Sequence, residues 1–197
     1  MEQNWTATHT AAMEAIISNE SISFPILGGI DATNEQGWCL LHFAAALGKR
    51  HAVKMLLDAG ANPDLRATDG GLTPLLMAIV KQHTETVDIL IEGGANPNLG
   101  GNIATLLVTA LSLSPINEHI VCALIEAGAD VNRTPSDRRS PLHLAAGKGM
   151  LDAARGMIAR GANINAKDDQ GRTPYDVAQK FCPSENREEM MRVLLGS

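Results

Sequence analysis

An adjacent glycine and alanine return along this chain at a nearly constant interval. The four pairs begin at Gly60, Gly94, Gly128 and Gly161, so the spacings are 34, 34 and 33 residues. A short polar segment follows each pair, at residues 62–64, 96–98, 130–132 and 163–165. This regular period predicts that one small structural unit is copied and stacked along the chain.

A second recurring segment lies 21 residues before three of these glycines and is found once more near the C-terminus. It reads CLLHFAA from Cys39, TPLLMAI from Thr73, SPLHLAA from Ser140 and TPYDVAQ from Thr173. A hydroxyl side chain followed by proline is typical of a helix N-terminus. Apolar residues then recur at helical spacing in two short segments, and the glycine ends the second. Neither helix is long enough to be stable alone, so the units must stack.

These segments resemble the ankyrin repeat, whose pattern is approximately TPLHxAAxxGHxxxVxxLLxxGADVN. Residues 39–64 and 140–165 match it closely, and residues 73–98 match it less well. The copy from Ala104 to Asn132 is the most degraded, with about three extra residues between its helices near Ser114 and Pro115. The resemblance implies an all-α solenoid of stacked helix-turn-helix units joined by β-hairpin loops.

We interpret residues 1–197 as a single domain of this kind. Residues 1–34 form a degenerate N-terminal cap, with one helix over 6–18 and a second over 21–27. The repeats that follow are 35–67, 68–100, 101–134 and 135–167. Residues 168–197 form a C-terminal capping repeat, and its second helix, Ser184–Leu195, has the polar face that a terminal unit needs for solubility.

Composition agrees with thin, closely packed helices and narrows the classes of partner. Only 3% of the residues are aromatic although 45% are hydrophobic, and the alanine pairs at 44–45 and 145–146 let helices approach closely. The net charge of −6 argues against a nucleic-acid partner. Residues 133–180 nevertheless carry nine Lys/Arg and five Asp/Glu, against five and fourteen in residues 1–132. This basic segment is either a solvated surface or the footprint of a partner.

The cysteines and the apolar segments indicate where the protein is located. Cys39, Cys122 and Cys182 form no CxxC pair, which is typical of reduced thiols in a cytoplasmic protein. We expect Cys39 to be buried and Cys182 to be exposed. The first ten residues contain no apolar signal segment, and no apolar run approaches the length that spans a bilayer. We therefore expect a cytoplasmic protein with no membrane partner.

No motif for catalysis, a cofactor or a metal stands out. His42 and His143 occupy the same repeat position, as His9 does more weakly. Because His42 and His143 are three repeats apart, they cannot share a metal ion. The resemblance implies that each ring ties a helix start to adjacent loop backbone. His51, His83 and His119 are interpreted as surface residues. The segment Gly147-Lys148-Gly149 lacks the spacing of a phosphate loop. We therefore expect no enzyme activity and no cofactor.

The resemblance implies that a partner protein binds to the hairpin tips and to the exposed positions of the first helices, which line a concave face. Val80, Lys180 and Phe181 are also first-helix positions in this scheme. The candidate partner-binding residues are Glu35, Gln36, Trp38, Leu47, Lys49, Asp69, Leu72, Lys81, Ile103, Asp137, Arg138, Arg139, Lys148, Met150 and Arg172.

Three features of this set suggest how a partner is recognised. Trp38 either contacts a partner, since Trp is enriched in binding hot spots, or folds back over the N-terminal cap; both interpretations stay open. An apolar strip is predicted from side chains at nominally exposed sites: Leu47, Leu72, Ile103 and Met150. Arg138 replaces the usual tip glycine beside Arg139. With Arg133 and Arg172, these basic tips could receive an acidic patch.

The functional hypothesis is a monomeric, non-catalytic protein–protein interaction module that works as a stand-alone adaptor or inhibitor. An immunity-type protein that blocks a specific enzyme or toxin is a narrower version of it. An enzyme that uses the irregular loop at Ser112–Asn117 is the alternative from a different class, and it requires a cluster of perturbed titratable groups there.

Overall fold

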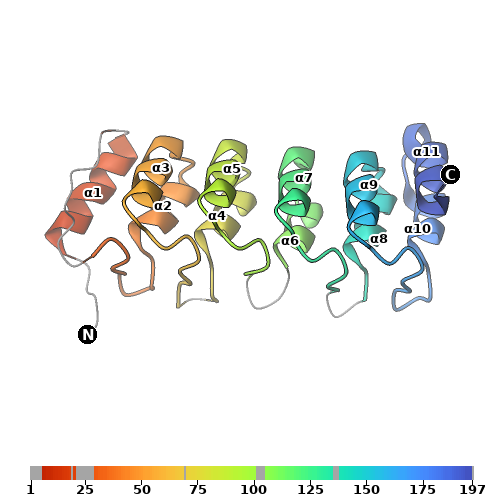
Figure 1. Ribbon diagram of the computed structural model, residues 1–197, viewed down its shortest axis with the longest axis horizontal. Coiled ribbons are helices and arrows are strands. Elements are labelled where there is room, and N and C mark those ends of the chain that lie inside the picture. The colour runs from red at the N-terminus through yellow and green to blue at the C-terminus, as the bar shows by residue number, and fades with distance from the viewer. Residues whose placement is uncertain are drawn as a thin grey trace. The chain divides into compact units, whose positions relative to one another are not determined.

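The computed structural model describes residues 6–18, 20, 29–68, 70–100, 105–134 and 138–196. These residues form pairs of short helices joined by loops and contain no strand longer than a single bridged residue (Figure 1). The predicted all-α repeat fold is therefore confirmed. The chain divides into two compact units, unit 1 from Met1 to Asn102 and unit 2 from Ile103 to Ser197.

Unit 1 contains one cap helix and two helix pairs. Its helices are α1 (Ala7–Ser18), α2 (Leu40–Ala46), α3 (Arg50–Asp58), α4 (Pro74–Val80) and α5 (Thr84–Glu92). The first helices α2 and α4 pack against each other, the second helices α3 and α5 do the same, and α1 packs on α2. The second helix expected over 21–27 lies outside the described residues.

Unit 2 contains three helix pairs. Its helices are α6 (Leu106–Ser112), α7 (Glu118–Glu126), α8 (Pro141–Lys148), α9 (Leu151–Ala159), α10 (Pro174–Phe181) and α11 (Ser184–Leu195). The first helix α8 packs against both α6 and α10, and the second helix α9 packs against both α7 and α11. The same two-row arrangement is therefore repeated inside each unit.

Side-chain caps begin the first helices. The hydroxyl of Thr73 accepts a hydrogen bond from the amide of Leu76 at 3.2 Å, and Thr105 accepts one from Val108 at 3.1 Å. The third repeat is thus capped at Thr105, and the alignment that started it at Ala104 was wrong by one residue. Twelve positions separate the N-caps Thr105 and Asn117, against ten between Thr73 and His83, so the insertion is two residues rather than three.

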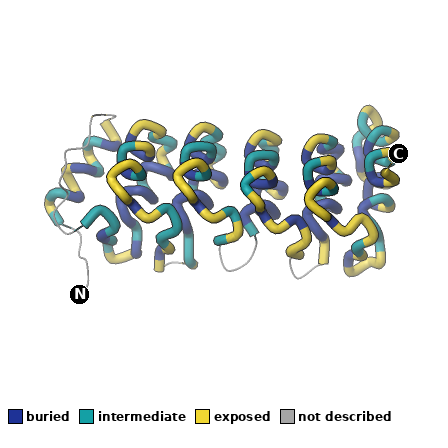
Figure 2. The backbone as a smooth tube through the Cα atoms, viewed as in Figure 1, coloured by how far each residue is buried: buried dark blue, intermediate teal, exposed yellow. Residues whose placement is uncertain are grey.

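The core of each unit consists mainly of aliphatic side chains. Figure 2 shows buried residues along the helices and exposed residues on the turns and loops. Ala44, Ala45, Ala145 and Ala146 are all fully buried. A methyl group at these positions is what allows α2 to approach α4 and α8 to approach α10. This packing explains how the core is filled with so few aromatic rings.

At three helix starts a buried histidine joins the N-cap residue to the next loop. His143 Nδ1 accepts a hydrogen bond from the amide of Ser140 at 3.1 Å, and its Nε2 donates to the carbonyl of Arg172 at 2.9 Å. His42 binds Cys39 N and Leu72 O in the same way, at 3.2 and 3.0 Å. His9 also repeats the pattern, with Gly29 O at 2.8 Å. The predicted structural role of these histidines is confirmed.

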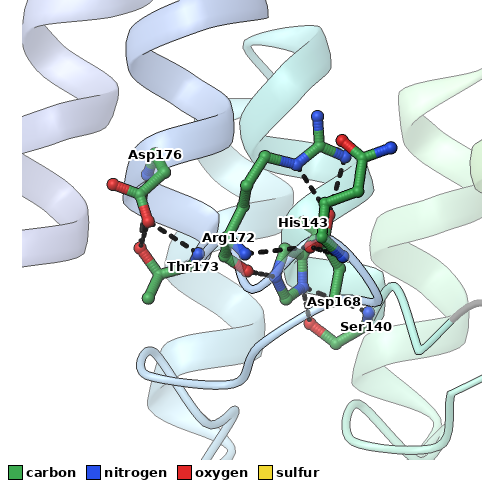
Figure 3. Close-up of polar contacts among 7 residues, drawn as sticks. Ser140, His143, Asp168, Arg172, Thr173 and Asp176 are labelled. Atoms are coloured by element: carbon green, nitrogen blue, oxygen red, sulfur yellow. Dashed lines mark hydrogen bonds and ion pairs between the residues drawn. The ribbon is translucent and has the colours of Figure 1, made fainter.

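Asp168 shapes the last loop of unit 2 (Figure 3). Its Oδ1 accepts hydrogen bonds from the amides of Gln170 and Arg172, each at 2.9 Å, and its Oδ2 accepts from Arg172 Nε and Nη2 at 2.9 and 2.7 Å. Desolvation of this buried carboxyl raises its pKa, but the hydrogen bonds outweigh that effect and lower the pKa of Asp168 to about 2. Asn34 makes the same two backbone contacts in the first loop, at 3.0 Å each.

One loop position needs a left-handed backbone in every described repeat. It lies two residues before the N-cap and is occupied by Gly37, Gly71 and Gly171 with φ of 77, 69 and 72°. Arg138 occupies it in the fourth repeat with φ of 55°. A side chain is disfavoured in this conformation, so the fourth loop retains arginine at a cost to stability.

The histidine bridge should make a measurable contribution to stability. We expect His143→Ala to lower the free energy of unfolding by about 1–3 kcal/mol, because it removes the acceptor of the Ser140 amide and one of the two donors to the Arg172 carbonyl. Urea denaturation followed by circular dichroism measures the change. His51→Ala, at an exposed site on α3, should change stability by less than about 0.5 kcal/mol. Equal effects of the two substitutions would contradict the proposed role of the bridge.

Asp168 should make stability depend on pH in the acidic range. Because its pKa is lower in the folded state than the ordinary value of 3.8, its contribution is present above about pH 4 and is lost as the pH falls towards 2. The difference in unfolding free energy between wild type and Asp168→Asn should therefore shrink over that interval. Asp169→Asn, in the same loop, controls for the change in net charge. A wild-type advantage over Asp168→Asn that stays constant down to pH 2 would contradict this account.

The left-handed loop position can be tested in both directions. Gly171→Ala should lower the free energy of unfolding by about 1 kcal/mol, because the added Cβ meets no atom within 4 Å and only the backbone preference changes. Arg138→Gly should leave stability equal or slightly higher. Thermal unfolding of both variants measures these changes in stability. A marked loss of stability in Arg138→Gly would show that the arginine stabilises the fold.

Candidate functional site

The N-caps of the first helices give all repeats a common register. They are Cys39, Thr73, Thr105, Ser140 and Thr173. The fourth and eighth residues after each cap share one face of the first helix, because they are four positions apart, and the residue before the cap lies in the loop that enters the helix. We call these residues the first-helix face of each unit.

The first-helix face of unit 1 is mainly apolar. Its members are Trp38, Phe43, Leu47, Leu72, Met77 and Lys81, and Val80 lies beside them at the end of α4. Leu47 and Val80 are 45% and 47% exposed, which is unusual for large aliphatic side chains. This face therefore offers apolar contact area with one adjacent lysine.

Trp38 packs on the first helix of its own repeat. Its ring centroid lies 5.2 Å from that of Phe43 and 6.2 Å from that of His42, and it is stacked on the histidine. The tryptophan is half-buried as a result. It therefore contributes to the packing of its own repeat and keeps part of its surface exposed, and its contact with a partner stays a prediction.

The first-helix face of unit 2 is hollowed and basic. A groove of about 370 Å³ lies between the α8 and α10 repeats. Leu144, Gly147 and Val177 give it an apolar lining, and Arg139, Lys148 and Arg172 add cations to it. Phe181 also lines the groove and is 52% exposed. The Lys180 ammonium and the Arg172 guanidinium lie 5.2 and 5.5 Å from the centre of its ring.

A smaller hollow of about 270 Å³ adjoins the groove at the last loop. Asp168, Asp169 and Gln170 line it together with Arg139 and Arg172. Arg172 is half-buried and its guanidinium is held by Asp168, so its charge is largely compensated. The predicted binding residue Arg172 thus acts first as a structural part of the loop.

The structure places the other predicted partner-binding residues as follows. Those that are exposed are Glu35, Gln36, Leu47, Lys81, Arg138, Arg139 and Lys148. Trp38, Lys49 and Leu72 are half-buried. Lys49 donates a hydrogen bond through Nζ to the carbonyl of Ile17 in α1, at 3.1 Å. Asp69, Ile103 and Asp137 lie outside the described residues.

Met150 corrects the sequence-based prediction. It is only 6% exposed and forms the N-cap of α9, where its carbonyl accepts the first hydrogen bond of the helix. Its side chain therefore belongs to the core and not to an exposed apolar strip. The strip predicted from Leu47, Leu72, Ile103 and Met150 is not formed as one surface, since only Leu47 among its described members is exposed.

Cys182 was expected to be exposed, and this was wrong. It ends α10 with no exposed surface, and burial raises the pKa of its thiol. Its carbonyl accepts hydrogen bonds from the Arg187 guanidinium at 2.8 and 3.1 Å, which ties α11 to the end of α10. Cys39 is buried as predicted, and burial raises the pKa of its thiol to about 11.

His83 is a structural residue that sequence reasoning missed. Its Nε2 donates to the carbonyl of Ala46 at 3.1 Å, and its ring lies where a Cβ on Gly48 would be. Gly48 adopts a φ of 65°, so the missing side chain and the left-handed backbone both suit this contact. His83 is the N-cap residue of a second helix, as Lys49 and Met150 are. This shared position could have indicated its structural role from the sequence.

The irregular loop of the third repeat lacks the cluster that an enzyme site requires. Ser112 donates its hydroxyl to the carbonyl of Val108 at 2.7 Å, and Asn117 caps α7 through Ile120 N at 3.4 Å. Burial, with Glu118 second, raises the pKa of nearby Cys122 and makes its thiol less reactive. Across the described residues, no group of three or more His, Cys, Asp or Glu side chains is placed to hold a metal ion.

None of the described helices has the length and hydrophobicity needed to cross a membrane. This finding is consistent with the short helix pairs of both units and adds no further candidate site.

The chain is similar in sequence to known repeat proteins over the segments that contain the repeats. A family model for ankyrin repeats in three copies matches residues 9–101, and a second model for ankyrin repeats in many copies matches residues 124–178. Rabankyrin-5 of Mus musculus and Rabankyrin-5 of Homo sapiens are each 48% identical to this chain over 42 residues. That segment is 21% of this chain and 4% of either relative. Together the two models cover most of the chain, and the chain therefore belongs to the ankyrin repeat family.

Proposed function

We propose that this protein binds a partner protein through its first-helix faces and the adjoining loops, as an adaptor or inhibitor. Ankyrin repeats are protein–protein interaction modules and are generally non-catalytic. The proposed activity is accordingly binding alone, by a monomer and without a cofactor.

One observation carries this proposal. Leu47 and Phe181 occupy the same repeat position in different units, and they are 45% and 52% exposed. Neither side chain is needed to fill the core, since the equivalent position holds a lysine at Lys81 and Lys148. Large apolar side chains kept in solvent at a variable position are typical of a binding surface.

The two first-helix faces differ in chemistry although they share one scaffold. Unit 1 presents Leu47 and Val80, whereas unit 2 presents Phe181 among cations. Two different faces suit an adaptor that contacts two proteins. They equally suit an inhibitor that contacts one protein through both faces, including an immunity-type protein that blocks an enzyme or toxin.

The cysteines support a cytoplasmic location for this activity. Cys39, Cys122 and Cys182 are all free thiols, and two of them are buried. Unpaired thiols persist in a reducing compartment, so we propose that the partner is met in the cytoplasm.

Substitutions on the exposed faces should abolish partner capture without unfolding the chain. We expect Leu47→Asp with Phe181→Asp to reduce capture of at least one lysate protein about tenfold, measured by quantitative mass spectrometry of affinity-purified material. Leu195→Asp makes the same change at a side chain that is 65% exposed on α11 and should capture as wild type does. Circular dichroism verifies that all variants are folded. If the captured proteins do not change, the proposed faces do not bind a partner.

The single variants separate the two proposed roles. Loss of different proteins in Leu47→Asp and Phe181→Asp indicates an adaptor. Loss of the same protein in both variants indicates one partner that spans both units, as expected of an inhibitor.

A further inference from the structure

The groove of unit 2 combines an apolar centre with a basic rim. Leu144, Val177 and Phe181 provide apolar surface in a space of about 370 Å³. This volume lies within the range of side-chain and small-molecule pockets. Phe181 is large, half in solvent and exposed at the edge of the groove, so its burial by a ligand would be favourable.

Four cations lie in or next to the groove residues. Arg139 and Lys148 line the groove, Lys180 lies 5.2 Å from the centre of the Phe181 ring, and Arg138 precedes Arg139 in the loop before α8. All four side chains are exposed. Neither Arg138 nor Lys148 forms an ion pair with a carboxylate of the described residues. The nearby carboxylates are Asp168, which is paired with Arg172, and Asp169 in the adjoining hollow.

Arg138 adds an independent argument that this charge is useful. The equivalent residue is glycine at 37, 71 and 171, and all of these positions adopt positive φ. An arginine there carries a backbone cost that glycine avoids. Since Arg138 is exposed, its retention at a strained position favours a role for its side chain outside the fold.

We propose that this groove binds an acidic linear segment of the partner protein, in which at least two carboxylates flank one large apolar side chain. The apolar side chain enters the groove against Leu144, Val177 and Phe181. One carboxylate pairs with Arg138 and Arg139 at the loop end, and another pairs with Lys148 and Lys180 at the helix end. This inference rests on the proposed function, because it names the chemistry of the partner at one of its two faces.

Charge complementarity favours a peptide of this kind over other occupants. A polyanion such as nucleic acid would use the cations but would not require an aliphatic centre in the groove. A second copy of this chain is acidic over residues 1–132, with fourteen Asp/Glu against five Lys/Arg, and is a competing occupant that the experiment must separate.

The experiment selects peptides and then measures them. A phage-displayed library of random 12-residue peptides is panned on the full chain, and the most enriched sequence is synthesised with a fluorescent label. Anisotropy then gives its Kd for wild type, Arg138→Gly, Phe181→Ala, Leu47→Asp and Leu195→Ala. Arg138→Gly installs the residue found in the other loops, so loss of binding in this variant does not reflect unfolding.

We expect the enriched peptides to carry acidic residues on both sides of an aromatic or large aliphatic residue. Kd should rise about fivefold in Arg138→Gly and about tenfold in Phe181→Ala, and should not change in Leu195→Ala. Binding should also weaken as salt increases, because exposed cations are screened. Replacing the apolar residue of the peptide by serine should weaken binding to wild type but have little effect on Phe181→Ala.

Several results would overturn the inference. They are enrichment without an acidic bias, a Kd that Arg138→Gly and Phe181→Ala leave unchanged, and tighter binding of heparin than of the peptide with no effect of Phe181→Ala. A dimer in sedimentation equilibrium that Arg138→Gly dissociates would assign the groove to a second copy. Selected peptides that respond to Leu47→Asp alone would refute the groove but leave the proposed function intact. The proposed function fails separately, if no captured protein depends on either face.

Discussion

The stacking of first helix on first helix inside each unit is the constraint on which the rest of this structure depends, and at α1, α2 and α8 a buried histidine ties the helix start to the following loop. His143 receives the amide of its own cap residue and donates to the carbonyl of Arg172. One ring thereby sets the start of α8 and the path of the last loop at once. His42 does the same between α2 and the loop that ends at Leu72. Because neither helix of a pair is stable alone, this link converts local caps into a stacked array.

The fixed scaffold leaves a small number of positions free to vary, and these carry the difference between the two units. At the eighth position after the cap, unit 1 has Leu47 and Lys81, and unit 2 has Leu113, Lys148 and Phe181. The backbone there is held by caps and packed alanines, so the side chain does not affect folding strongly. Arg138 shows the limit of this freedom, since it occupies a left-handed position at a cost that glycine would not incur.

Much of this architecture could be predicted from the chain alone, and the errors have a common origin. The last helix was expected at Ser184–Leu195 and is found there, and the histidine bridges were expected from the repeat. Met150 was placed on the surface as a first-helix position and Cys182 because it lies in the C-terminal cap, but both are helix-cap residues that face the core. His83 was placed on the surface because it lies beside a second helix, yet it binds Ala46 across the repeat boundary.

The sequence by itself determined the period, the caps, the all-α repeat fold and the family, because these follow from local preferences and short-range spacing. Only the tertiary structure decided which exposed residues form a surface together. The groove of unit 2 requires α8 and α10 to pack closely through alanines, so that Arg139, Lys148 and Phe181 converge from separate repeats. The stacking of Trp38 on His42 and the compensation of Arg172 by Asp168 likewise depend on side-chain directions. Spacing along a chain specifies the face of a helix, whereas contact also depends on the neighbour it packs against.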